Sequence, residues 1–370
     1  MDKNIARKQI KKLYFIDGFG GLMIAGASWV ALLYARGFST VEIGVFESIF
    51  HAASMCFEIP SGAAADIFGR KRVMIMSGIM TVVSALMMIL LNSFGGIAIA
   101  MICSALSYNL ASGTREALAY DSLKNGGIED EYGKFAANDL ILYRLTSSVG
   151  TLMAGVALML GYKRAYLLDI LFSLVVILIG CSLWDVKTQL QTEKKIPHRL
   201  KEVAIESVRV LNDNTRIRKI IIFNASIGAV ATLIVFFLQA KLPDLGLTSL
   251  WLGPALFIVG LGSVLGAKTA EHFQRFSYRK LGLICGICIC VAFASVFSGN
   301  VLVLMLGGFI GGFADSLIEV KSDVVINEMI PSNQRATLMS VNSFAFSCVM
   351  IVLAPIFGWL FRDGSFVFNL

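Results

Sequence analysis

The residues that could carry chemistry are ionisable side chains inside long apolar stretches of the chain. Charges are costly to remove from water, so such residues are candidates for a functional site. Carboxylates there could take up and release protons, and an arginine could pair with them. Four of these residues lie at one depth, roughly 6–11 Å from the same end of their stretches at about 1.5 Å per residue: Asp17, Glu58, Glu116 and Arg144. They predict a proton-coupling or substrate-binding site. The alternative is a structural ion-pair network, which suits Arg115 and Glu116 because both adjoin a loop.

A second arrangement of titratable groups follows one predicted helix face. Glu47, His51 and Glu58 are spaced i, i+4 and i+11, so they share a face. Histidine titrates near neutral pH, and the three groups therefore predict a proton relay. The alternative is that Glu47 is a rim residue and that His51 hydrogen-bonds to it. Asp139 and Asp169 are further carboxylates in apolar stretches.

Long apolar stretches must position these side chains. Of the 370 residues, 56% are hydrophobic and 15% are charged, and the mean hydropathy is +0.75. Apolar runs of 18 or more residues are typical of membrane-spanning helices, and they are too long for barrel strands. The sequence therefore predicts an all-α integral membrane protein with eleven spans, at 12–34, 43–65, 73–92, 96–120, 137–160, 164–184, 219–240, 249–270, 281–298, 300–326 and 337–360. Another apolar segment begins at Ser365, and we expect a twelfth helix of which the chain holds only the start.

The distribution of cations predicts the orientation in the membrane. Of the 32 lysines and arginines, 24 fall in the N-terminal segment and in alternate loops, and five fall in the opposite loops. Lysine and arginine accumulate on the cytoplasmic side. We therefore expect a cytoplasmic N-terminus and a multi-pass protein of a bacterial inner membrane. This topology also explains the net charge of +7 without nucleic acid, which we do not expect as a partner.

A short basic turn between the second and third spans carries a recognisable spacing. Its residues are Gly62, Asp66, Gly69, Arg70 and Lys71. A glycine at the first position lets a neighbouring helix approach closely. The carboxylate lies at a helix end and can pair with an arginine. The second glycine can take the turn, and the two cations can stay with an anionic leaflet.

This spacing resembles the loop 2–3 signature of the major facilitator superfamily of transporters, although Ile67 stands where a basic residue is usual. An internal repeat extends the resemblance, because Ala267–Arg275 after the eighth span matches Gly62–Arg70 after the second at an offset of 205. The resemblance implies two six-helix bundles with pseudo-twofold symmetry that work by alternating access. We place them at 1–184 and 219–370, joined by a cytoplasmic linker at 185–218 in which Pro197 opens an amphipathic helix.

The resemblance also implies a gate. In the family, the signature loop pairs with the end of the fourth helix and docks on the eleventh helix when the protein faces outward. Asp66, Arg70 and Asp121 match these positions. The resemblance thus implies that breaking their contacts favours the inward-facing state, since each state is a distinct packing arrangement.

The leading hypothesis for function is a secondary active transporter similar to the twelve-helix drug/proton antiporters. It would carry out proton-coupled efflux of an amphipathic or drug-like small molecule. The fifth span lacks the proline of the Gly-Pro signature usual in those antiporters. The alternative is proton-coupled uptake, by symport, of a small polar or anionic nutrient, with Arg144 binding the anionic group.

The remaining expectations concern chemistry and partners. We do not expect an enzyme, because only one of the three histidines lies in a span. We expect no cofactor and no metal, because Cys285, Cys288 and Cys290 lie in an apolar span without a histidine or a carboxylate. The expected partners are a small-molecule substrate, protons and the lipid bilayer, and a monomer suffices for this mechanism.

Overall fold

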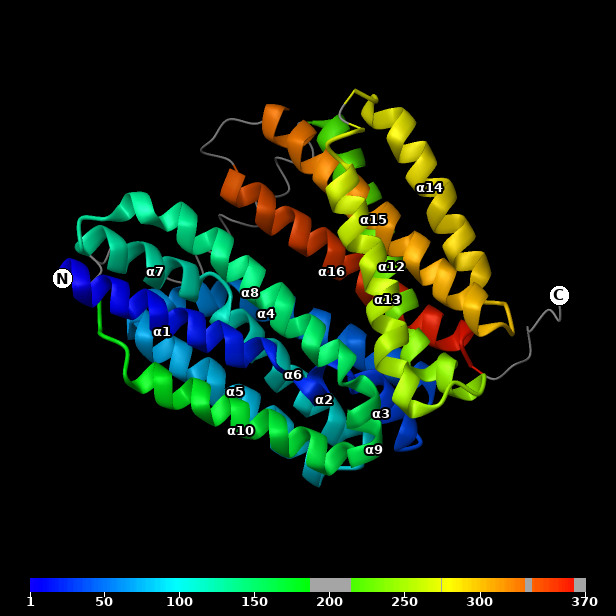
Figure 1. Cartoon of the computed structure of the whole chain (residues 1–370), viewed down its shortest axis with the longest axis horizontal. Helices are drawn as coiled ribbons and strands as arrows, with labels where there is room; N and C mark the ends of the chain where they lie inside the picture. Colours follow the sequence, from blue (N-terminus) through cyan, green and yellow to red (C-terminus); the bar gives the residue numbers. More distant parts are fainter. Residues whose placement is uncertain (187–213, 274, 330–334, 363–370) are drawn as a thin grey trace. The chain divides into compact units, whose positions relative to one another are not determined.

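The computed structural model describes residues 1–186, 214–273, 275–329 and 335–362, and every secondary-structure element among them is helical (Figure 1). Before the linker the helices are α1 (Lys3–Gly21), α2 (Ile24–Ala27), α3 (Trp29–Ala35), α4 (Thr40–Phe68), α5 (Arg70–Leu90), α6 (Phe94–Ala111), α7 (Thr114–Asn125), the 3₁₀ turn η1 (Glu129–Glu131), α8 (Tyr132–Leu152), α9 (Ala154–Leu160) and α10 (Tyr162–Cys181). After the linker they are α12 (Thr215–Asp244), α13 (Ser249–Thr269), α14 (Tyr278–Ser295), α15 (Val301–Met329) and α16 (Arg335–Leu360).

Each of the eleven predicted spans coincides with a helix or with a broken series of helices. Eight of the described helices are long and apolar enough to cross a membrane, or nine if the bent pair Glu129–Leu152 and Ala154–Leu160 counts as one span. The fold class is therefore an all-α membrane protein. The amphipathic helix predicted after Pro197 and the twelfth helix predicted from Ser365 lie outside the described residues.

By its internal contacts the chain forms two units. The first comprises Met1–Leu32 and Ile49–Arg199, and the second comprises Leu33–Ser48 and Leu200–Leu370. The sequence-based boundary assigned 33–48 to the N-terminal bundle. These residues instead group with the second unit because the first part of α4 packs on α16, where the Thr40 hydroxyl donates to the carbonyl of Gly358 at 2.6 Å.

In the first unit, the first predicted span is not one helix. It breaks at Leu22–Met23 and again at Ser28, giving α1, α2 and α3. The buried carboxylate of Asp169 on α10 accepts the backbone N–H groups of Ile24, Ala25 and Gly26 at 2.7, 3.2 and 2.9 Å. A carboxylate in this position satisfies donors at a helix start that would otherwise lack partners. Asp169 therefore holds the broken segment against α10.

In the second unit, small residues allow close helix packing. A Cβ added to Gly262 or Gly266 of α13 would come within 2.1 or 2.2 Å of the carbonyl oxygens of Phe309 and Phe313 on α15. A Cβ on Gly307 of α15 would likewise meet the side chain of Ser295, the last residue of α14. Lipid tails are as apolar as the helices, so close backbone approach contributes much of the association in a membrane. The glycines of α13 and α15 therefore allow these helices to pack with their backbones close together.

Candidate functional site

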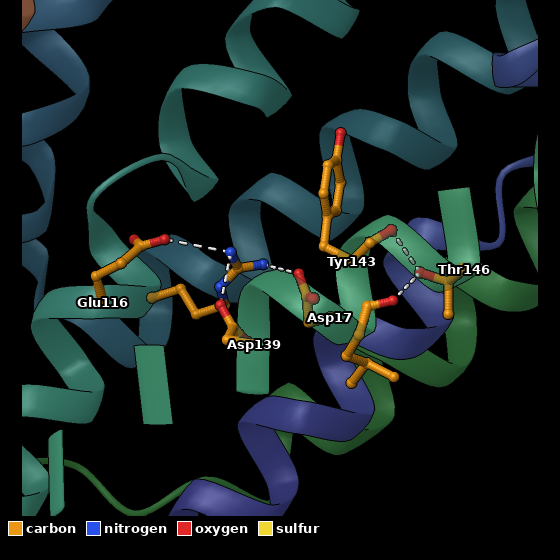
Figure 2. Close-up of polar contacts among 7 residues, drawn as sticks. Asp17, Glu116, Asp139, Tyr143 and Thr146 are labelled. Atoms are coloured by element: carbon orange, nitrogen blue, oxygen red, sulfur yellow. Dashed lines mark hydrogen bonds and ion pairs between the residues drawn. The ribbon is translucent and has the colours of Figure 1, made fainter. Parts of the chain in front are cut away.

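The first unit holds three carboxylates around one guanidinium. Arg115 Nη1 pairs with Asp17 Oδ1, while Nη2 lies 3.2 Å from Glu116 Oε1 and 3.0 Å from Asp139 Oδ2. Figure 2 shows the labelled carboxylates Asp17, Glu116 and Asp139 approaching the same group from three directions. We call these four residues the Arg115 cluster.

Three helices position the Arg115 cluster. Asp17 comes from α1, Arg115 and Glu116 from the start of α7, and Asp139 from α8. The chain breaks between α6 and α7, where Gly113 has a φ of +72°, a conformation that glycine adopts at little cost. Arg115, two residues after this break, pairs with Asp17 of α1 and Asp139 of α8. Buried apolar side chains next to the cluster fix the same helices, among them Leu13 and Ile16 of α1, Leu118 of α7 and Phe135 of α8.

The carboxylates of the cluster are incompletely satisfied. Asp17 and Asp139 are only 3% and 5% exposed. Each of the three carboxylates uses one oxygen on Arg115, and the other oxygens, Asp17 Oδ2, Glu116 Oε2 and Asp139 Oδ1, are buried without a hydrogen-bond partner among the described residues. With every group ionised, three negative charges face one positive charge. Buried polar atoms without partners are costly, so the cluster is suited to bind a proton or another cation.

A cavity of about 480 Å³ opens beside the cluster. Asp17, Arg115 and Glu116 line it together with the aromatic rings of Tyr108 and Tyr143. Three of its hydroxyl groups are engaged where α5 meets α6, because the side chains of Ser77, Thr81 and Ser107 hydrogen-bond to one another and to backbone carbonyls. The charged end of the cavity offers a ligand the carboxylates and the guanidinium of the cluster.

Other residues predicted for the site lie elsewhere. Arg144 of α8 is exposed and forms no ion pair with a described residue, so Arg115 takes the place expected for Arg144. Glu58 is partly buried on α4 and does not line the cavity. Glu47 and His51 are buried on α4, and the His51 ring lies edge-on to Phe50 with centroids 5.5 Å apart. The proton relay along α4 stays a prediction.

The signature turn joins α4 to α5. Gly69 has a φ of +86°, and so it takes the turn as predicted. Arg70 pairs with Asp121 at the end of α7 and also donates to the carbonyl of Ala117. This is the pairing that the family resemblance implied, while the role of the pair as a gate stays a proposal.

The other residues of the turn fall into two groups. Asp66 and Lys71 are partly buried at the helix ends on either side of Gly69. The close helix approach predicted at Gly62 is absent from its unit, since Gly62 is exposed and no described atom lies within 4 Å of where its Cβ would be. Within the first unit the space beside Gly62 is therefore open, and its role in close helix approach stays a prediction.

Two members of the Arg115 cluster were not among the predicted site residues. Arg115 and Asp139 were recognisable only as ionisable residues within spans. Considering all ionisable residues of the spans as possible partners would have included both, because charged side chains within a membrane pair with one another. The two cavity tyrosines carried no comparable signal, since tyrosines are frequent at span ends.

Helices long enough to span a membrane, two contact-defined units and a buried charge cluster next to a cavity define a polytopic membrane transporter. The model of the Major Facilitator Superfamily matches residues 13–274 and 272–368. The chain belongs to this superfamily. It is therefore a transporter and not an enzyme.

Known proteins of similar sequence or structure agree with this assignment. An uncharacterized MFS-type transporter, YxaM of Bacillus subtilis (strain 168), is 22% identical over 335 residues, covering 89% of this chain and 83% of that protein. The crystal structure of the nucleoside transporter NupG matches with a TM-score of 0.71 at 17% identity, covering 98% of this chain and 93% of that one. The D-xylose-proton symporter matches with a TM-score of 0.61 at 14% identity over 96% and 89% of the chains. At these identities the two structures support the fold alone.

Proposed function

We propose that this transporter exchanges protons for an amphipathic organic cation, which it exports from the cell by alternating access. The observation that carries the proposal is the Arg115 cluster, in which three carboxylates share one guanidinium and each leaves one buried oxygen without a hydrogen-bond partner in the described part of the chain. Carboxylates arranged in this way can be neutralised by protons or by a bound cation. A proton and an organic cation would neutralise the same carboxylate charge, so the two compete for the site. Competition at one site is the thermodynamic basis of antiport.

The cavity beside the cluster suits a cation that also has an apolar body. The rings of Tyr108 and Tyr143 line it near Arg115 and Glu116, and an aromatic face attracts an organic cation. Met23 and Met74 contribute adaptable apolar surface to the same cavity. A volume of about 480 Å³ lies within the range of roughly 300–1,000 Å³ typical of small-molecule sites.

The second candidate is proton symport of a small polar or anionic nutrient. Arg115 favours it, because protonated carboxylates would release the guanidinium to bind an anionic group of the substrate. One structural neighbour is a proton symporter for D-xylose. The two candidates predict opposite proton movements when substrate is added on one side of the membrane.

Proton movement in proteoliposomes distinguishes the two candidates. The vesicles contain a pH-sensitive dye, and a fluorescent lipophilic cation is added outside. Antiport predicts that cation entry drives protons out and makes the lumen alkaline, whereas symport acidifies it. Asp17→Asn and Asp139→Asn should each reduce substrate-driven proton flux at least tenfold, because each removes a proton-binding carboxylate from the cluster. The matched control is Asp130→Asn, which removes an exposed carboxylate of η1.

Three outcomes are informative. Alkalinisation that is lost in both cluster variants and kept in Asp130→Asn supports antiport at the Arg115 cluster. Proton flux that is unchanged in both cluster variants would make the cluster a structural ion-pair network. If panels of organic cations move no protons while polar or anionic nutrients acidify the lumen, symport replaces antiport.

A further inference from the structure

The second unit contains a large groove that the transport proposal does not use. It lies between α12 and α14 and has a volume of about 1680 Å³. Sites for drug-sized ligands enclose roughly 300–1,000 Å³, so this groove is larger than such a ligand needs. Small residues on one face of α14 leave the space open: Gly282, Gly286, Cys290 and Ala294 follow one another at intervals of four.

The walls of the groove are apolar and face outward from the unit. Phe223 of α12 forms one side, and its ring lies 3.4 Å from the position of a Cβ added to Gly282. On α14, Leu283, Ile287 and Val291 line the groove and are 68%, 56% and 52% exposed. Side chains this apolar and this exposed on a membrane-spanning helix are typical of a surface that contacts lipid.

One end of the groove is strongly basic. Both helices begin there, and four cations line that end: Arg216, Lys219, Arg279 and Lys280. All four are exposed, and no described carboxylate pairs with any of them. The distribution of cations along the chain predicts that this end lies at the cytoplasmic surface, where anionic lipids concentrate.

We propose that the groove between α12 and α14 binds an anionic phospholipid, with the phosphate among the four cations and the acyl chains along α14. Charge complementarity selects the head group, since clustered lysines and arginines beside a span attract anionic lipids. The dimensions suit the tail. At about 1.5 Å per residue, the distance from Lys280 to Ala294 is roughly 21 Å, and one leaflet contributes roughly 15 Å of hydrocarbon.

The charge pattern disfavours two other occupants, the preceding segment of the chain and a second copy of the chain. Residues 187–213, which precede α12, carry six lysines and arginines and four carboxylates. This net positive segment would be repelled by the four cations of the groove. A second copy of the chain would present the same basic end to itself in a symmetric contact, which also opposes pairing. An anionic lipid meets both the apolar wall and the basic end.

Lipid binding can be measured on the purified full-length protein. In native mass spectrometry, phosphatidylglycerol should remain bound at least tenfold more than phosphatidylcholine with the same acyl chains. The pair Arg279→Gln and Lys280→Gln should weaken phosphatidylglycerol retention roughly tenfold to thirtyfold, because each cation near the surface contributes to anionic lipid binding. The matched control pair is Lys163→Gln and Arg164→Gln, which removes two adjacent exposed cations at the start of α10.

A second pair of variants tests the apolar part of the groove. Gly286→Leu should fill it and reduce retention of both lipids at least fivefold, while Gly260→Leu on α13, which has open space around it, should not. A benzophenone side chain introduced at Leu283 then identifies the occupant by photo-crosslinking in native membranes.

The outcomes separate the three occupants. A lipid adduct at Leu283, together with phosphatidylglycerol preference that only the groove variants lose, supports the proposal. An adduct with 187–213 or with a second copy of the chain would overturn it, and so would equal retention of the two lipids. If the Lys163 and Arg164 variant loses as much retention as the groove variant, the attraction is a general surface effect and the site does not exist.

Discussion

Arg115 is the residue on which the candidate site depends, because it is the cation to which all three carboxylates of the cluster bond. Replacing it with glutamine leaves two buried carboxylates, Asp17 and Asp139, and the partly exposed Glu116 without their shared cation. Breaking a buried ion pair in this way typically costs about 3–5 kcal/mol. We expect Arg115→Gln to lower the free energy of unfolding by about this amount, measured by titration with a denaturing detergent in micelles.

The double variant distinguishes a direct contact from a general loss of stability. Adding Asp139→Asn to Arg115→Gln should restore part of the loss, with a coupling energy of about 1–3 kcal/mol. The control cycle pairs Arg115→Gln with Asp130→Asn on η1 and should be additive within about 0.5 kcal/mol. Equal coupling in both cycles would argue that the Arg115–Asp139 pair at 3.0 Å has no special energetic role.

A second ion pair lies outside the membrane-spanning segments and titrates with pH. The guanidinium of Arg7 donates to Glu131 Oε1, with Nη2 at 2.5 Å and Nε at 3.2 Å. This hydrogen bond and the attraction between the charges hold the pKa of Glu131 below its ordinary value and raise the pKa of Arg7. Since the folded pKa of Glu131 is lowered, its stabilising contribution is present above the unfolded pKa and is lost as pH falls through the folded pKa.

Glu131→Gln should therefore lower the melting temperature at pH 7, and this difference should shrink as the pH falls below the ordinary pKa of glutamate and through the lowered folded pKa. The difference at pH 7 is expected to be small, because both side chains are in contact with water, and to shrink in 1 M salt. Thermal melts across this pH range check it. A difference that grows as the pH is lowered would contradict the sign of the pKa shift.

The sequence predicts the depth of the charged layer in the membrane but not which charged residues contact one another within it. Counting residues along a helix gives depth, and depth placed Asp17 and Glu116 in the same layer. Depth does not give the direction around the helix axis. Arg115, and not Arg144, pairs with Asp17 and Asp139. These pairs depend on which sides of α1, α7 and α8 face one another, and counting residues along a span does not give that direction.

At the scale of elements, α13 and α15 are held by close backbone contact. A Cβ on Gly266 would come within 2.2 Å of the carbonyl oxygen of Phe313, a backbone atom that cannot rotate away. Gly266→Ala should therefore destabilise the second unit by about 1–3 kcal/mol, because the helices must separate. The measurement is unfolding in a denaturing detergent, as for Arg115.

Gly260 supplies a matched control on the same helix. Nothing lies within 4 Å of the position of its Cβ, so Gly260→Ala should be neutral or stabilise by about 0.5–1 kcal/mol through reduced backbone entropy of the unfolded chain. If both variants were equally destabilised, the loss would reflect helix propensity in general and not the contact with α15.

Hydropathy predicted where helices lie more reliably than where they break. The first span was expected to be one helix at 12–34, and it consists of α1, α2 and α3. The partner that holds the broken segment is Asp169, more than 140 residues away in sequence. The hydropathy of a short stretch of sequence reports its apolar length but contains no information about a carboxylate far away in the chain. A helix break that depends on such a tertiary contact therefore cannot be predicted from local sequence.

At the scale of the whole molecule, transport requires that the two units exchange between states open to either side of the membrane. Arg70 and Asp121 join the start of α5 to the end of α7 within the first unit. We expect this pair to shape the surface by which the first unit docks in the outward-facing state. An interaction that contributes on the order of 1.5 kcal/mol in one state only changes the ratio of states about tenfold.

Asp121→Asn should therefore increase the ratio of inward-facing to outward-facing molecules about tenfold relative to the unaltered protein. Spin labels at Asp130 in the first unit and Arg275 in the second, introduced after replacing the seven native cysteines, report the distance between the units by pulsed electron resonance. Arg70→Gln should have the same effect as Asp121→Asn, and Arg72→Gln, which removes an exposed neighbouring cation, should have little.

The combination of both substitutions decides what the pair does. If Arg70 and Asp121 act together on the gate, Arg70→Gln with Asp121→Asn changes the distance distribution no more than either alone, since the contact is already lost. Additive effects would mean that each residue acts through separate partners, Arg70 through the carbonyl of Ala117 among them. Distributions unchanged in all three variants would restrict the pair to holding α5 against α7, and the gate would have to be sought at other residues.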